Sequence, residues 1–291
     1  MTIETRVGLR ADGPINRTVF ILWFQGEAAA PRLVRRCIDS WRTQNPTWDV
    51  VVLDRNSLSE YVELPAWCSS KLGAAHLSDL VRLRLLEAHG GVWADATTYC
   101  SWPLDSWLPG AYAGGFFAFA WPDPGYELSN WFLAADPGEP LLTNTRELLE
   151  AYWAEMPERE PGRIRILLGK ILVRLLRRSS KTTSLWFSFP VRRVLKVYPY
   201  FAFHYAFAAA VGWDVQLRNR WNSVVKISSD GPHSLQRYGL DRRVDEVMMN
   251  ELSDPSVPLY KLTYKGTDHL IDDSSSALGC LLSVSRDQSS A

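Results

Sequence analysis

The stretch from His76 to Thr97 constrains the fold of this chain more than any other. Its apolar residues from Leu77 to Ala88 recur at helical spacing, densely enough that most of the predicted helix must be buried. Gly90 and Gly91 then predict the end of this helix, because glycine readily adopts the left-handed conformation of a C-terminal cap. Residues 92–94 follow as a short apolar run. The stretch therefore predicts a buried helix, a sharp stop and a buried strand that ends at Asp95.

Two charged residues lie on the predicted helix. Asp79 and Arg82 are three positions apart, so they share one face. A buried charge without a partner costs free energy, so each must have one. The simplest interpretation is that the two side chains pair with each other. The alternative is that they bind a ligand together, which is favoured by their apolar surroundings and by the aspartate that follows at the end of the strand.

The order of elements before this stretch predicts a parallel sheet. Residues 18–24 and 49–54 are apolar, β-branched runs, and residues 31–41 between them carry a helical pattern. A strand, a helix and a second strand in this order form a parallel pair, and ligands of such sheets bind beyond the carboxyl ends of the strands.

Side chains at those strand ends are therefore candidates for a binding site. We expect Trp23, Gln25, Asp54 and Asp95 to lie along one edge of the sheet. Two of them also have simpler interpretations. A tryptophan in an apolar strand is more often a core residue, and Asp54 can cap the turn that follows it.

The central stretch resembles a known family. Its residues fit the pattern SDxxRxxxLxxxGGxWxDxT of the glycosyltransferases of capsular polysaccharide synthesis, and more distantly it is similar to the family 32 mannosyl- and galactosyltransferases and the clostridial glucosylating toxins. The first strand and an NWFxAA segment at 130–135 resemble the same family. The matching positions in the stretch are Ser78, Asp79, Arg82, Leu86, Gly90, Gly91, Trp93, Asp95 and Thr97.

This resemblance implies an α/β fold of the GT-A type, a Rossmann-like and mostly parallel sheet flanked by helices. We expect one such domain over residues 18–273, with a helical, basic insertion at about 155–200. Residues 1–17 are expected to be a flexible N-terminus, and residues 274–291 a C-terminal tail.

The resemblance also implies roles for single residues. Asp79, Arg82, Asp95 and Asn130 are the expected catalytic residues, which hold the donor sugar and its diphosphate, although Ser129 or Asn130 can equally cap a helix. The roles of His204 and His233 stay open. The expected nucleotide-binding residues are Trp23, Gln25, Asp54, Trp93, Thr97 and Lys265.

The metal expected for such a site depends on an incomplete motif. The families named above use a DxD motif to position a divalent cation, but here the sequence is Asp95-Ala96-Thr97 and the second carboxylate is missing. Mn²⁺ or Mg²⁺ held by Asp95, His269 and the diphosphate is one expectation, since hard cations prefer oxygen ligands. The alternative is that Arg82 and Lys265 neutralise the diphosphate instead.

The function implied is that of a retaining glycosyltransferase. It would move a hexose from a nucleotide-diphosphate sugar, most simply a UDP-sugar, to a hydroxyl acceptor in polysaccharide, glycolipid or natural-product glycoside synthesis. The alternatives are a nucleotide-sugar-binding module with little turnover, suggested by Thr97, or a membrane-surface adaptor.

Charge is concentrated in residues 163–196. This segment has ten Lys or Arg and no Asp or Glu, whereas the remainder has 22 basic and 32 acidic residues. Plotted as a helix, its first part places Ile164, Leu168, Leu172 and Leu175 opposite a basic stripe. Such a helix, with Trp186, Phe187 and Phe189 beyond it, suits an anionic membrane surface, and an ordinary surface helix is the alternative.

Composition narrows the class further. An apolar fraction of 46% and a charged fraction of 22% are typical of a globular protein. The four cysteines have no CxxC spacing, so neither a zinc site nor a disulfide framework is predicted. With no apolar run of membrane-spanning length and no signal-like N-terminus, we expect a cytoplasmic protein, at most peripheral at the inner membrane face, and no nucleic-acid partner.

Overall fold

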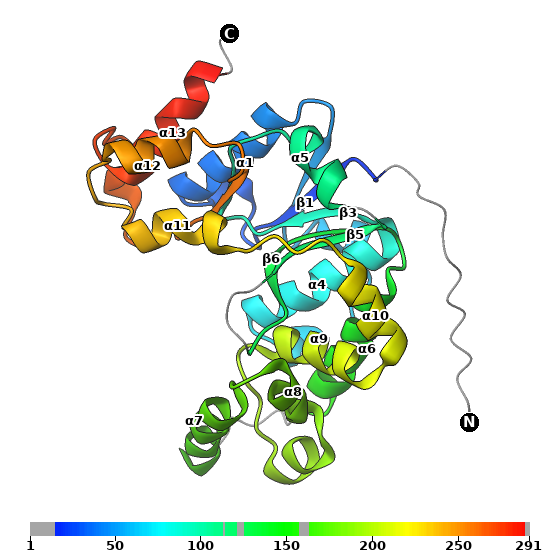
Figure 1. The fold of residues 1–291 in the computed structure, drawn as a ribbon. Helices are drawn as coiled ribbons and strands as arrows, with labels where there is room; N and C mark the ends of the chain where they lie inside the picture. The colour runs from blue at the N-terminus through cyan, green and yellow to red at the C-terminus, as the bar shows by residue number, and fades with distance from the viewer. Residues whose placement is uncertain (1–14, 113, 121–124, 157–162, 289–291) are drawn as a thin grey trace.

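The computed structural model describes residues 15–112, 114–120, 125–156 and 163–288 (Figure 1). Its centre is a five-stranded sheet with the order β2-β1-β3-β6-β5, in which β1 pairs in parallel with β2 and β3, and β6 is antiparallel to β3 and β5. Four of the five strands therefore point the same way, which confirms the predicted mostly parallel α/β sheet. The strands are β1 (Thr18–Leu22), β2 (Asp49–Leu53), β3 (Gly91–Ala94), β4 (Thr98–Cys100), β5 (Phe116–Ala120), β6 (Leu128–Ala135) and β7 (Leu259–Lys261).

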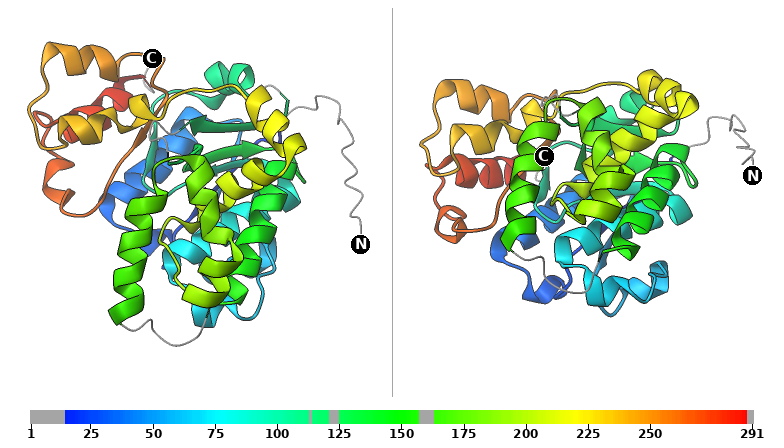
Figure 2. Two further views of the ribbon diagram at one scale, coloured as in Figure 1. Left: turned by 60° about the horizontal axis from the view of Figure 1, so that its bottom comes forward. Right: turned by 90° about the horizontal axis from the view of Figure 1, so that it is seen from below.

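Helices cover both faces of this sheet (Figure 1). Figure 2 shows from two further sides that α4, α6 and α9 lie together over one face. The helices are η1 (Glu27–Ala29), α1 (Arg32–Gln44), α2 (Leu58–Tyr61), α3 (Cys68–Lys71), α4 (Ala74–His89), α5 (Leu104–Ala111), α6 (Pro140–Ala154), α7 (Arg163–Leu176), α8 (Ser180–Thr183), η2 (Ser184–Phe187), η3 (Pro190–Leu195), α9 (Ala202–Trp213), α10 (Val215–Ser223), α11 (Asp230–Tyr238), α12 (Glu246–Leu252), η4 (Asp268–Leu270) and α13 (Ala277–Gln288).

Alternate side chains of β1, an inner strand of the sheet, pack in two separate cores. Phe20 and Leu22 pack in the core formed with α4, α6 and α9, whereas Val19 and Ile21 pack in the core formed with α1 and α5. Successive side chains of a strand point to opposite faces, so a strand buried on both sides is apolar throughout. This arrangement explains the continuous apolar run that predicted a central strand.

The glycine pair after α4 is required by the packing. Gly90 and Gly91 have φ of 66° and 87°, and the Gly90 amide donates to the Leu86 carbonyl at 2.9 Å. A Cβ on Gly90 would lie 2.6 Å from Cδ of Pro137, and one on Gly91 would lie 2.7 Å from the Thr18 carbonyl oxygen. The chain can therefore turn from the buried helix straight into β3 only where side chains are absent.

The C-terminal part forms a third core beside α1. The β4 and β7 strands make a separate antiparallel pair, and α11, α12 and α13 pack around it (Figure 1). The expected tail from residue 274 is wrong for its first half, because Ala277, Leu278 and Leu281 of α13 are buried in this core. The expectation for residues 1–17 lies almost wholly outside the described residues.

The basic segment is helical, as predicted, but its apolar pattern differs from the expectation. Leu168 and Leu172 of α7 do pack against the core, whereas Leu175 is exposed. Trp186 and Phe187, expected at an interface, are buried, and only Phe189 of the three aromatics is exposed. η2 packs against α9, and Trp186 and Phe187 are therefore core residues and not part of a membrane-facing surface.

Within the described residues, no helix combines the length and the apolar character that crossing a membrane requires.

Candidate active site

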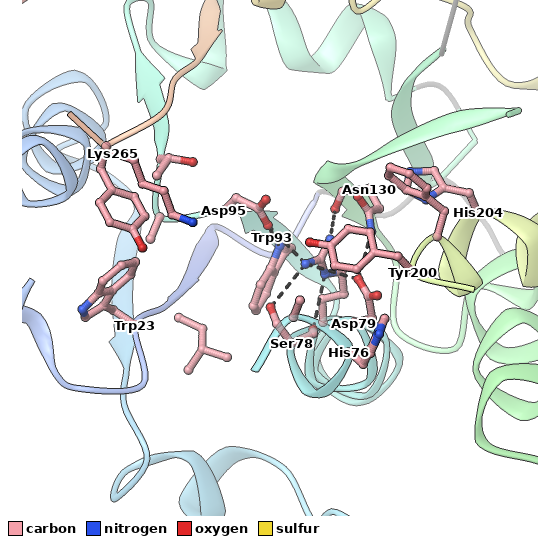
Figure 3. A pocket seen from close by; sticks show the side chains of 17 residues that line it. Trp23, His76, Ser78, Asp79, Trp93, Asp95, Asn130, Tyr200, His204 and Lys265 are labelled. Atoms are coloured by element: carbon pink, nitrogen blue, oxygen red, sulfur yellow. Dashed lines mark hydrogen bonds and ion pairs between the residues drawn. The ribbon is translucent and has the colours of Figure 1, made fainter. Parts of the chain in front are cut away.

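A cavity of about 500 Å³ opens where β1 and β3 end, next to the first turns of α4 (Figure 3). Trp23 follows β1, and Asp95 follows β3, so two of the three expected strand ends meet at this cavity. Its walls come from six separate segments of the chain. The lining residues are Leu22, Trp23, Ala75, His76, Ser78, Asp79, Arg82, Trp93, Asp95, Ala96, Thr97, Asn130, Tyr200, Phe201, His204, Tyr264 and Lys265.

Arg82 connects two carboxylates at the base of this cavity. Its Nη2 lies 3.4 Å from Asp79 Oδ1 and 3.3 Å from Asp95 Oδ1. The side chains of Arg82 and Asp79 are only 6% and 11% exposed, while that of Asp95 is 26% exposed. The predicted pairing of Asp79 with Arg82 is therefore confirmed, and both residues also line a cavity, where the binding of a ligand stays a prediction.

Further hydrogen bonds fix the orientation of this network. Arg82 Nη1 donates to the backbone carbonyl of Asn130 at 2.6 Å, and Arg82 Nη2 donates to Ser78 Oγ at 3.2 Å. Asn130 Nδ2 donates to Asp79 Oδ1 at 2.9 Å, and Trp93 Nε1 donates to Asp95 Oδ1 at 3.0 Å. Asn130 lies inside β6, so the alternative in which it caps a helix is wrong. The guanidinium is thus held by α4, β3 and β6 together.

A second cation, which the sequence interpretation missed, completes the network. Lys261 of β7 donates from Nζ to Asp95 Oδ2 at 2.7 Å and to Thr97 Oγ1 at 2.9 Å. Its side chain is 17% exposed, and the residue does not line the cavity itself. The two carboxylates therefore alternate with two cations in the order Asp79, Arg82, Asp95, Lys261.

Burial and charge shift the ionisation of these groups. Burial raises the pKa of Asp79 to about 7, against the opposing effect of Arg82. Burial also raises the pKa of Asp95, but Lys261 and Arg82 outweigh it and hold this pKa below its usual value. Burial and the nearby Arg82 lower the pKa of His204 to about 3, so its imidazole is neutral at physiological pH. Asp95 is consequently the permanent anion of the site.

The other end of the cavity is aromatic. Trp23 is half-buried and packs edge-on against Tyr264, with ring centroids 5.5 Å apart. Its Nε1 is buried and, among the described residues, has no hydrogen-bond acceptor. Figure 3 shows Lys265 extending from the Tyr264 segment into the cavity, toward Asp95. This end offers a flat apolar surface and a cation, groups that suit a nucleobase and a phosphate.

Three predicted residues lie away from the cavity. Gln25 is exposed, and Asp54 accepts hydrogen bonds from the backbone amides of Asn56 and Ser57, both at 2.8 Å. These bonds lower the pKa of Asp54 and confirm the turn-capping interpretation. His269 is exposed in η4. None of the three is part of the cavity lining.

The predicted metal ligands are accordingly not assembled. Among the residues that the structure describes, no group of three or more His, Cys, Asp or Glu side chains is arranged to hold a metal ion. Both oxygens of Asp95 already accept hydrogen bonds, from Trp93 and Lys261, and the Thr97 hydroxyl accepts one from the same lysine. The donor set on this chain thus does not fit a divalent metal held by Asp95 and His269.

Several further lining residues were not predicted. His76 and Ser78 belong to the first turns of α4. Ser78 is four residues before Arg82 and shares its helix face, so helical periodicity could have found it. Tyr200, Phe201 and His204 form the opposite wall, with Phe201 and His204 ring centroids 5.7 Å apart. His233, the other histidine of open role, instead bonds the Ser229 carbonyl at 2.8 Å from Nδ1.

Comparison with known proteins identifies the family. The family described as "Capsular polysaccharide synthesis protein" matches residues 10–192, well over half of the chain, and the chain belongs to it. This range contains Trp23, Asp79, Arg82, Asp95 and Asn130.

Two curated relatives share part of the sequence. The "O-glycosyltransferase braB" of Annulohypoxylon truncatum is 29% identical over 175 residues, which cover 52% of this chain and 40% of the relative. The "Glycosyltransferase afumC" of Aspergillus fumigatus is 28% identical over 160 residues, which cover 47% of this chain and 41% of the relative. The chain spans about two fifths of the length of these relatives.

One solved structure is also similar in outline. The "PaToxG Glycosyltransferase" aligns over 92% of this chain and 87% of its own length, with a TM-score of 0.39 and 13% sequence identity.

Proposed function

We propose that this protein is a glycosyltransferase that binds a nucleotide-diphosphate sugar in the cavity beside α4. The observation that carries the proposal is the ionic network of Asp79, Arg82 and Asp95 at the base of a cavity that also contains Trp23 and Lys265. Membership in the capsular polysaccharide synthesis family supports it, as do two relatives named glycosyltransferases. A hexose linked to UDP is the donor that fits the expectation from the sequence.

In this proposal each part of the cavity has a role. Trp23 stacks on the base, and Lys265 meets the diphosphate. Asp79 and Asn130, which are hydrogen-bonded to each other at 2.9 Å, receive the sugar hydroxyls. Rigid, pre-oriented polar groups of this kind stabilise charge that develops during a reaction without needing to reorganise.

We expect the retaining mechanism that the resemblance implies to proceed without a covalent enzyme intermediate. The two carboxylates that line it, Asp79 and Asp95, are both paired with Arg82 and poorly placed to act as free nucleophiles. In a front-face attack, the bond from the anomeric carbon to the diphosphate breaks, and its electron pair stays on the leaving oxygen. The acceptor hydroxyl oxygen bonds to the anomeric carbon on the same face and gives its proton to that phosphate oxygen.

The acceptor is proposed to be a hydroxyl group of a saccharide, a glycolipid or a small natural product. One relative carries the name O-glycosyltransferase, which agrees with a hydroxyl acceptor. The basic segment supports a membrane-associated acceptor, because Leu167, Ile171 and Leu175 of α7 are about half exposed beside the exposed Lys170 and Arg174. An anionic membrane surface is therefore a proposed partner.

The test is nucleotide release from a panel of UDP- and GDP-sugars. We expect one donor to release nucleotide, and Asp95→Asn and Asp79→Asn to reduce the rate by about 100-fold. Asp39→Asn, a change at an exposed carboxylate of α1, is the matched control and should have no effect. The anomeric configuration of the product, read by NMR, tests retention.

Two outcomes would contradict the proposal. A protein that binds no nucleotide sugar has another function. A protein that binds one donor tightly but never releases nucleotide, with any acceptor, is a nucleotide-sugar-binding module, the alternative suggested by Thr97.

A further inference from the structure

Lys261 occupies the position between Asp95 and Thr97, the first and third residues of the DxD-like motif. Its ammonium group is 2.7 Å from Asp95 Oδ2 and 2.9 Å from Thr97 Oγ1. A metal ion bound by the first and third residues of such a motif would lie between these two side chains. The cation found there is part of the protein.

The backbone holds this lysine in place from both sides. The β4 and β7 strands pair so that Lys261 lies opposite Thr98, and the Leu262 amide donates to the Thr97 carbonyl at 2.8 Å. The adjacent strand residues Tyr99 and Tyr260 are buried. Lys261 is therefore part of a rigid strand pair, not of a surface loop.

The charges around Asp95 leave little need for a metal. Asp79 and Asp95 carry two negative charges at most, and Arg82 and Lys261 carry two positive charges. Divalent cations bind where several oxygen ligands with net negative charge converge. A divalent ion on Asp95 would have to displace the lysine or lie beside its ammonium group, and in a half-buried site that repulsion is poorly screened.

We propose that Lys261 takes the place of the divalent metal, so that this protein binds its donor and transfers the sugar without one. The proposal rests on the proposed function. Lys261 is a positioning residue: it holds Asp95 ionised and oriented and supplies a fixed positive charge behind it. Lys265 extends into the cavity (Figure 3) and would contact the diphosphate directly. As the bond from the sugar to the diphosphate breaks, these two cations stabilise the charge left on the phosphate oxygen, and neither gives up a proton.

The first test needs no nucleotide. The protein is titrated with Mn²⁺ and the bound ion is followed by electron paramagnetic resonance. We expect the wild type to bind no Mn²⁺ at this site. Lys261→Met should show the signal of bound Mn²⁺, and the double variant that also carries Asp95→Asn should lose it. A wild-type signal that is lost in Asp95→Asn would overturn the proposal, whatever the nucleotide specificity proves to be.

The second test measures the affinity for UDP and GDP by calorimetry, in EDTA and in Mn²⁺. The wild type should bind equally well in both, Lys261→Met should bind about tenfold or more weakly in EDTA and recover in Mn²⁺, and Lys261→Arg should stay close to wild type. Lys181→Met, at an exposed lysine outside this cavity, is the matched control. Circular dichroism shows that each variant is folded.

The two proposals fail in different ways. Wild-type nucleotide binding that requires Mn²⁺, or a Lys261→Met protein with unchanged affinity in EDTA, overturns the role of Lys261 and leaves the glycosyltransferase intact. Absence of UDP and GDP binding under every condition contradicts the proposed donor, while the Mn²⁺ titration still decides the role of the lysine.

Discussion

Asp79 and Arg82 lie one turn apart on α4, with Asp79 Oδ1 and Arg82 Nη2 3.4 Å from each other and both side chains nearly sealed from solvent. Arg82 Nη2 also lies 3.3 Å from Asp95 Oδ1, so Asp79 shares its counter-ion with a second carboxylate. This sharing explains why burial prevails over the nearby positive charge and raises the pKa of Asp79. A carboxyl group in such a position makes the stability of the protein depend on pH.

We predict that the wild type loses stability relative to Asp79→Asn as the pH rises from about 4 to about 7. Below this range Asp79 is protonated in both the folded and the unfolded chain, because its unfolded pKa is near 3.8 and its folded pKa is about 7. Within the range, ionisation is favoured only in the unfolded chain. The difference in the free energy of unfolding should change by up to about 1.4 kcal/mol per pH unit.

Denaturant titrations of both proteins at several pH values measure this slope. Asp54→Asn, at a carboxylate that does not line the cavity, is the matched control. The backbone amides of Ser57 and Asn56 lower the pKa of Asp54, so its contribution to stability is complete above pH 4 and is lost only at lower pH. The difference between the wild type and Asp54→Asn should therefore be flat between pH 4 and 7. If the difference in the free energy of unfolding between the wild type and Asp79→Asn does not change between pH 4 and 7, Asp79 is ionised in the folded protein and the prediction is wrong.

Two glycines with similar backbone conformations give a second prediction. Gly90 (φ 66°) and Gly138 (φ 71°) are both left-handed, but a Cβ on Gly90 would lie 2.6 Å from Pro137 and 2.9 Å from the Ala135 carbonyl oxygen, whereas one on Gly138 meets no atom within 4 Å. Gly90→Ala should therefore reduce the free energy of unfolding by about 1–3 kcal/mol more than Gly138→Ala. Chemical denaturation measures both, and equal losses would mean that the turn relaxes around the methyl group.

A third prediction concerns the base-binding end of the cavity. Trp23→Leu should weaken the affinity for the donor nucleotide by about 1–3 kcal/mol, because stacking of a base on an aromatic ring is lost. Trp213→Leu, at a tryptophan that is 54% exposed and does not line the cavity, is the control and should bind as the wild type does. Calorimetry with the nucleotide alone measures both. Unchanged affinity in Trp23→Leu would place the base elsewhere.

The sequence predicted the parts of this site that are set by local spacing. Asp79, Arg82 and Asp95 were found because a helical repeat, two glycines and a strand end fix their positions within one stretch. Lys261 could not be found in this way, since it is 166 positions from Asp95 and reaches it through the pairing of β4 with β7. Such pairings depend on the packing of the whole C-terminal part, which no local pattern encodes.

Local turn chemistry and tertiary packing explain the predictions that failed. The carboxylate of Asp54 is engaged by the two amides that follow it, so a strand-end aspartate became a structural cap. Trp186 and Phe187 are aromatic residues in a basic segment, a pattern that also suits a membrane interface, but the neighbouring α9 offers them an apolar surface inside the protein. In both cases the residue type fits two roles, and the following turn decides between them for Asp54, whereas packing against α9 decides for the two aromatic residues.

The last prediction is that α7 binds anionic vesicles through charge and apolar contact together. Reversing Lys170 and Arg174 to Glu should weaken binding to phosphatidylserine-containing vesicles by at least about tenfold, since each basic residue near the surface contributes about 1 kcal/mol. The control reverses the exposed Arg35 and Arg55, which changes the net charge equally but lies outside the basic segment. Leu167→Ser, at a side chain that is 59% exposed, should weaken binding without changing its dependence on salt. Co-sedimentation at two salt concentrations measures all three proteins. If the control pair weakens binding as much as the α7 pair, the attraction comes from overall charge and α7 is an ordinary surface helix.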